Sequence, residues 1–128
     1  MASALPPRPT DGELAILRVL WSKGPSTVRQ VHDVIASGRE LAYTTVLKLL
    51  QIMTDKGLVV RDERARTHVY EAASSEAQTQ KQLVTDLLDR VFDGSAAKLV
   101  LQALASKKAT PEELDEIRKL LNTRGGSR

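Results

Sequence analysis

The chain has no cysteine, and this absence excludes disulfides, thiolate metal sites and thiol nucleophiles. It also fits a reducing compartment, so we expect a cytoplasmic protein. Aromatic residues make up only 3% of the 128 residues, so any core has to be built from aliphatic side chains. No apolar run approaches the roughly 18–20 residues that a membrane span needs, and we expect no membrane insertion. Residues 1–9 contain prolines but no apolar stretch, and they predict a disordered lead-in rather than a signal peptide.

The two histidines, His32 and His68, offer little chemistry for catalysis. His32 precedes Asp33, which would allow an acid–base pair, but the sequence has no clustered second histidine, glycine-rich phosphate loop or metal-ligand spacing. We therefore interpret His32 as a surface residue of a helix, and we expect no enzymatic activity, metal or cofactor. The net charge of +3 permits nucleic-acid binding without requiring it.

Three helices are predicted in the first part of the chain, because helix start and stop signals recur there. Thr10 with Glu13, and Thr27 with Gln30, have the spacing of capping boxes at the starts of two helices. A third helix is predicted over residues 43–56, and the glycine that follows it supplies a C-terminal cap.

The hydrophobic period changes after the third helix. Valine and tyrosine are frequent in residues 58–61 and 67–72, and these segments flank the short polar segment 62–66. Two such segments around a short polar loop predict a β-hairpin. Three helices followed by a hairpin are the order of a winged helix-turn-helix domain, which we assign to residues 10–73.

Residues 74–128 predict a second domain made only of helices. Thr110 with Glu113 marks a helix start, and residues 96–105 are apolar nearly all round, as in a helix buried on most sides. A domain of about 55 residues has a marginal core alone, so we expect two copies to bury it together in a homodimer. The residues expected in the dimer interface are Leu83, Leu87, Val91, Leu99, Leu101 and Leu104. The expected fold class is therefore mainly α with a small antiparallel β-hairpin, a winged helix-turn-helix domain followed by a three-helix dimerisation domain.

The third predicted helix has an apolar and a polar face. When Val46 is placed at the centre of the inner face, Thr44 and Lys48 fall on the outer face, which enters the major groove in a helix-turn-helix. Arginines of the hairpin are placed to contact phosphates or the minor groove. An arginine in the first turn of the second helix can hold a further phosphate. The residues predicted to contact double-stranded DNA are Arg29, Tyr43, Thr44, Thr45, Lys48, Gln51, Arg61, Arg64, Arg66 and His68.

A series of short motifs extends over most of the chain. They include Leu41-Ala42-Tyr43-Thr44-Thr45-Val46, Lys56-Gly57-Leu58-Val59, Leu20-Trp21 and Leu99-Val100-Leu101. Taken together and in their order, they resemble the penicillinase and methicillin-resistance repressors of the BlaI/MecI type.

The resemblance implies a winged-helix repressor that dimerises through its C-terminal domain and binds a dyad, pseudo-palindromic operator near resistance genes. In that family a membrane sensor metalloprotease responds to β-lactam and triggers cleavage of the repressor. The staphylococcal members are cut at an Asn–Phe bond, and the aligned pair here is Gln102-Ala103, which marks the expected cleavage site. Ile52 is a second departure, because the family often has arginine at this position.

Two other functions stay open at this point. Any solvated helix has a polar outer face, so the third helix could dock a protein partner, as in a winged-helix protein-interaction module. A regulator with its own small-molecule pocket is a further alternative, although the low aromatic content and the short second region count against it. A steep fall of DNA affinity with salt would favour the repressor, and no affinity at low salt would favour the interaction module.

Overall fold

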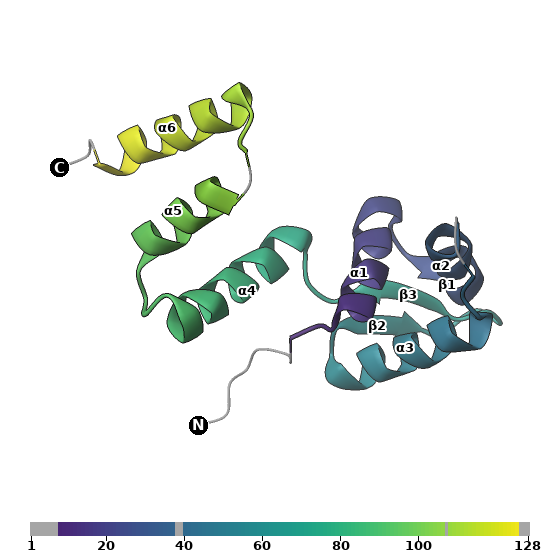
Figure 1. Ribbon diagram of the computed structural model, residues 1–128. Coiled ribbons are helices and arrows are strands. Elements are labelled where there is room, and N and C mark those ends of the chain that lie inside the picture. The colour runs from purple at the N-terminus through teal and green to yellow at the C-terminus, as the bar shows by residue number, and fades with distance from the viewer. Residues whose placement is uncertain (1–7, 38–39, 107, 126–128) are drawn as a thin grey trace. The chain divides into compact units, whose positions relative to one another are not determined.

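A computed structural model describes residues 8–37, 40–106 and 108–125 of the chain (Figure 1). The elements in chain order are α1 (Asp11–Lys23), β1 (Ser26–Thr27), α2 (Val28–Ile35), α3 (Tyr43–Lys56), β2 (Val59–Asp62), β3 (Val69–Ala72), α4 (Glu76–Val91), α5 (Ala96–Ser106) and α6 (Pro111–Gly125). Of the predicted lead-in, residues 1–9, only Arg8 and Pro9 are among the described residues. The chain forms two compact units, one that ends at Leu83 and one that begins at Val84.

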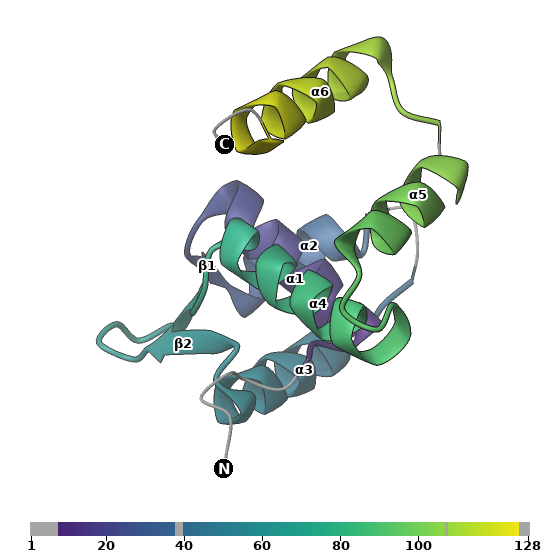
Figure 2. The same cartoon turned by 90° about the vertical axis from the view of Figure 1, so that its left-hand side faces the viewer.

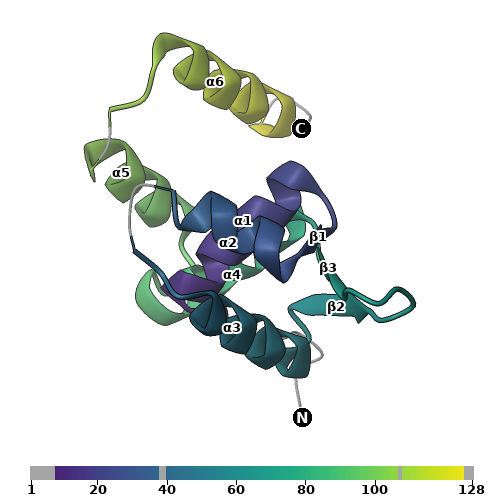
Figure 3. The same ribbon diagram turned by 90° about the vertical axis from the view of Figure 1, so that its right-hand side faces the viewer.

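The first unit is a winged helix, with three helices against a three-stranded antiparallel sheet in the order β1-β3-β2. The ends of β2 and β3 and the loop between them project from the unit as the wing, and α3 packs against β2 beside it (Figures 2 and 3). The predicted hairpin is therefore confirmed. The strand β1 was not predicted, because its two residues are too few to show an alternating pattern. It pairs with the central strand, Ser26 opposite Tyr70.

The core of this unit lies where α1 meets α2, α3 and the sheet. It is almost entirely aliphatic, as the composition requires, and Tyr70 of the central strand is its one fully buried aromatic residue. The buried apolar side chains are Ile16, Leu17, Val19, Leu20, Val28, Val31, Val46, Leu50, Met53, Leu58, Val59 and Tyr70.

The helix signals of the sequence are present as hydrogen bonds. The α1 and α2 capping boxes form. The side chains of Thr10 and Thr27 accept from the backbone N–H three residues later, and the side chains of Glu13 and Gln30 accept from the backbone N–H of the two threonines. Gly57 ends α3 with a φ of 83°, a left-handed conformation that glycine adopts without steric cost. Its N–H donates to the carbonyl oxygens of Met53 and Thr54 at the end of the helix.

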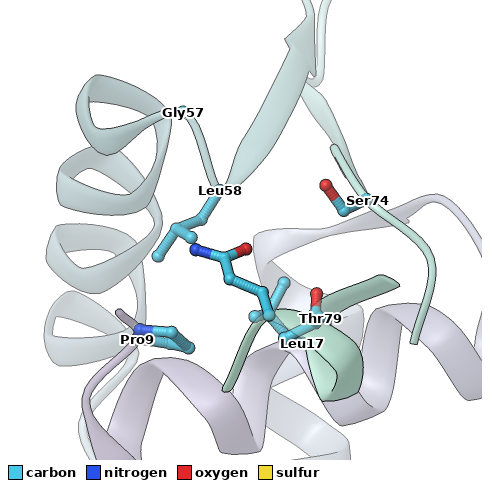
Figure 4. Close-up of a pocket in the computed structure, with 7 residues that line it drawn as sticks. Pro9, Leu17, Gly57, Leu58, Ser74 and Thr79 are labelled. Atoms are coloured by element: carbon cyan, nitrogen blue, oxygen red, sulfur yellow. The ribbon is translucent and has the colours of Figure 1, made fainter. Parts of the chain in front are cut away.

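The beginning of α4 also belongs to the winged-helix unit. Trp21 Nε1 donates to the carbonyl oxygen of Ser74 at 2.9 Å, which holds the link between β3 and α4 on α1. Thr79 is 8% exposed and lines a pocket of only about 10 Å³ together with Leu17 and Leu58 (Figure 4). The compact unit therefore extends past residue 73, where the winged-helix domain was predicted to end.

The second unit contains the end of α4 together with α5 and α6. The Thr110–Glu113 capping box begins α6 as predicted. Among the described residues of this unit, no side chain is fully buried within the single chain. Large apolar side chains are instead exposed, with Val91 at 65%, Leu101 at 67% and Leu121 at 63%.

Candidate nucleic-acid interface

The helix α3 has the two faces predicted from its sequence. Val46, Leu50 and Met53 are fully buried in the core. Thr44, Thr45, Lys48 and Gln51 are exposed on the other side, where their donors and acceptors are free to meet a base edge or a phosphate. Ile52 is 37% exposed, so its apolar side chain reaches the surface close to this polar face.

A partly buried ion pair links the end of α3 to α1. Lys56 Nζ lies 2.9 Å from both carboxylate oxygens of Glu13, whose residue is 2% exposed in the first turn of α1. Burial by itself raises the pKa of Glu13, but the bonds from Lys56 and Thr10 outweigh it, and the pKa lies below its ordinary value of 4.5. The carboxylate is therefore charged at neutral pH and couples α1 to α3.

Three side chains pack together where α2 meets the start of α3. The Arg29 guanidinium lies 4.8 Å from the centre of the Tyr43 ring, in the geometry of a cation–π contact. The His32 ring meets the same tyrosine edge-on at 6.0 Å and donates from Nε2 to the carbonyl oxygen of Leu41 at 2.7 Å. The His32 side chain is 17% exposed, so it lies partly buried at the surface of α2 rather than fully in solvent. It joins α2 to the segment before α3.

The first turns of α2 and α3 share one groove with the wing. The groove has a volume of about 190 Å³, and it brings together Arg29, Tyr43, Arg66 and His68 from the predicted set. Arg66 and His68 are exposed, and neither forms an ion pair with any described residue. Two arginines and a histidine around one concavity form a surface suited to a phosphodiester backbone.

The other two wing arginines are paired within the wing. Arg64 donates from Nε and Nη2 to the carboxylate of Asp62, at 3.0 Å and 2.8 Å. These bonds, and a bond from the Arg64 backbone, lower the pKa of Asp62 to about 2. The Arg61 guanidinium lies 2.7 Å from the carboxylate of Glu63. Its hydrogen bond to Tyr70, followed in size by that to Glu63, raises the pKa of Arg61.

Comparisons with known proteins identify the family of this fold. Residues 9–123 match the family model described as Penicillinase repressor. The chain belongs to the penicillinase-repressor family. The predicted BlaI/MecI-type family is thus confirmed, and the protein is a winged-helix DNA-binding repressor rather than an enzyme.

Curated relatives of this repressor cover most of its length. The transcriptional regulator BlaI of Mycobacterium tuberculosis is 33% identical over 112 residues, which are 87% of this chain and 80% of the relative. The penicillinase repressor of Bacillus licheniformis is 22% identical over 115 residues, 90% of each chain. The solved complex structure of hsRosR-S4 matches 92% of this chain and 90% of its own, at 15% identity and a TM-score of 0.52, and supports the fold.

The remaining predicted residues of the repressor lie in its helical region. Gln102 and Ala103 are exposed residues in the middle of α5. Leu83 and Leu99 are half-buried, whereas Leu87, Val91, Leu101 and Leu104 are exposed. No helix of the described residues is long and apolar enough to cross a membrane. No group of three potential ligands suited to a metal ion occurs in that part of the chain.

The acidic residues of the wing were not among the predicted site residues. Three arginines of the hairpin were predicted as phosphate ligands, but Asp62 and Glu63 pair with two of them. The two acids between two arginines over positions 61–64 were the available signal. A tight loop brings side chains two residues apart into contact, which the order of the charges alone does not reveal.

Proposed function

We propose that this repressor binds a pseudo-palindromic operator as a homodimer, with α3 in the major groove and the groove of Arg29 and Arg66 on the phosphate backbone. The observation that carries this proposal is the shared groove, because it joins cationic residues of α2 and of the wing beside the exposed face of α3. Half-sites separated by about one helical turn, roughly 10 base pairs, or a multiple of it, would present one major groove to each subunit.

Alanine substitutions separate base recognition from phosphate binding. We expect Lys48→Ala and Thr44→Ala to change sequence preference, by about 1–3 kcal/mol for each side chain that bonds to a base. Arg66→Ala should weaken binding to all sequences alike and lower the slope of log affinity against log salt by about 0.9. Binding titrations with operator and mixed-sequence duplexes over a range of salt measure both effects, and Arg18→Ala on α1 removes the same charge as a control.

Two results would contradict the DNA contacts. Unchanged affinities of the Lys48 and Thr44 variants for operator and mixed-sequence DNA would show that α3 does not select sequence. No affinity of the unmodified protein for DNA at low salt would favour a protein-interaction module instead.

The homodimer is supported by the lack of a core in the second unit. Its described residues, from Val84 onward, include no buried side chain in the single chain, although many of them are large and apolar. Burying each such side chain stabilises a protein by about 1.5–3 kcal/mol, and a second copy provides the missing surface. Leu87, Val91, Leu101 and Leu104 are the exposed members of the proposed interface.

Release from the operator by proteolysis in α5 completes the proposal. By resemblance to the family, a membrane sensor metalloprotease is the partner that triggers the cut near Gln102-Ala103. A cut there would separate the subunits and leave each winged helix folded. Each half would then bind DNA without the increase in effective concentration that a dimer provides.

A further inference from the structure

The wing presents its cations together with their own counter-ions. At the end of β2 and the start of the loop, Asp62 and Glu63 lie in sequence between Arg61 and Arg64, and each acid bonds to one of these arginines. Arg66 carries no such partner among the described residues. The three arginines are therefore not equivalent as phosphate ligands.

The interaction between Arg64 and Asp62 has the form of a phosphate contact. Two parallel N–H groups of the guanidinium reach the two carboxylate oxygens, and the same two-pronged arrangement is how arginine holds a phosphate. Asp62 Oδ1 also accepts from the backbone N–H of Arg64 at 3.0 Å, which keeps the acid beneath the arginine. The Arg64 side chain is 90% exposed, so nothing else covers it.

A DNA phosphate would have to compete with Asp62 for this guanidinium. If Arg64 turns to the phosphate, the carboxylate loses its partner and faces a second negative charge. If Arg64 stays, part of its donor capacity and its charge are already satisfied. An exposed ion pair contributes little to stability, so Arg64 can leave Asp62 for a phosphate. The loss of the ion pair nevertheless reduces the net contribution of the phosphate contact to DNA affinity.

We propose that Asp62 acts as an internal phosphate mimic that limits the affinity of the wing for DNA of any sequence. The proposal rests on the DNA contact of the wing under the proposed function. Glu63 likewise limits the contribution of Arg61 to DNA affinity. Arg66 is then the wing arginine that can contact DNA without breaking an ion pair. Asp62 is thus a residue that sets affinity without touching DNA.

Asp62→Asn tests the proposal with mixed-sequence double-stranded DNA as the probe. Asparagine keeps the oxygen that accepts from the Arg64 backbone but removes the charge, so the loop conformation is retained. We expect tighter DNA binding and a salt slope steeper by about 0.9, the value for one additional neutralised phosphate. The increase in affinity should accordingly be about threefold larger at 50 mM salt than at 200 mM.

Matched variants distinguish this mechanism from a general change in charge. Glu71→Gln removes the same charge from an exposed position on β3 and should give a much smaller increase in affinity with little change in slope. In the double variant Asp62→Asn with Arg64→Ala, the increase over Arg64→Ala alone should disappear. Glu63→Gln should raise affinity in the same direction as Asp62→Asn.

The outcomes separate failure of the inference from failure of the proposed function. Equal or weaker binding by Asp62→Asn, with Arg64→Ala also weaker, would overturn the inference and show that Asp62 orients Arg64 for DNA. An increase in affinity that persists without Arg64 would overturn it as well. Wild-type affinity in both Arg64→Ala and Arg66→Ala would instead remove the wing from the DNA interface and so refute the proposed wing–DNA interaction itself.

Discussion

The Glu13–Lys56 ion pair joins two helices at the residue level, 43 positions apart in sequence. Glu13 serves twice, because its carboxylate also accepts from the backbone N–H of Thr10 and closes the capping box of α1. A buried carboxylate that lost its cation would be left uncompensated, which is strongly unfavourable. The pair therefore sets where the C-terminal end of α3 lies against the core.

Replacing Glu13 by glutamine tests this coupling. Glutamine retains the capping box but not the charge, so we expect the free energy of unfolding to fall by about 1–3 kcal/mol at neutral pH. The pKa of Glu13 in the folded protein lies below its ordinary value of 4.5. The stabilisation is therefore present above that value and is lost as the pH falls through the folded-state pKa.

Urea unfolding of both proteins from neutral to acid pH measures the effect. The difference between wild type and Glu13→Gln should shrink on acidification, whereas Glu71→Gln should track the wild type throughout. A difference that stayed constant with pH would show that the charge of Glu13 does not stabilise the fold.

In the proposed dimer, the helix α5 would gain the burial that its composition predicts. Its nearly continuous apolar sequence predicted burial on most sides, yet none of its residues is buried in the single chain. A protease needs an extended segment, so the helical backbone at Gln102-Ala103 has to open before it can be cut. Within the proposed dimer, packing against the partner would oppose this opening.

We expect cleavage near Gln102-Ala103 to be slow for the DNA-bound dimer and faster for free protein. Leu101→Glu, which places a charge on the exposed apolar face of α5, should be cut faster still because it weakens the dimer. Following the mass of the repressor in cells exposed to a β-lactam tests the cleavage. An intact 128-residue chain during full derepression would require a different release mechanism.

At the level of the whole molecule, the two units differ in how completely they bury their apolar residues. The winged helix has a closed core of twelve buried apolar side chains, whereas the described part of the second unit has none within one chain. A unit this small needs further burial to be stable. Folding of the second unit and association of two chains are accordingly coupled in the proposed dimer.

Light scattering at micromolar concentration should give twice the 14.0 kDa mass of one chain. Val91→Glu should shift the protein toward the monomer. It should also weaken operator binding, because the two winged helices are then no longer linked in one dimer. Gln80→Glu, an exposed residue on α4, serves as the charge-matched control and should remain dimeric. A monomeric wild type would contradict the dimer.

The sequence alone determined the parts of this protein that depend on neighbours along the chain. Capping boxes bond residues three positions apart, Gly57 ends α3 through its own backbone conformation, and the spacing around Val46 separates the faces of α3. Each of these leaves a pattern within one or two helical turns. The winged-helix order and the family motifs follow from the same local signals.

Only the tertiary structure decided which distant groups meet. The groove of Arg29 with Arg66, the bond from Trp21 to Ser74 and the pair of Glu13 with Lys56 join residues far apart in sequence. No periodicity encodes such interactions, because they depend on how helices and strands pack. The same is true of the wing, where the turn of the loop, and not its count of arginines, left Arg64 bonded to Asp62 and Arg66 without a partner among the described residues.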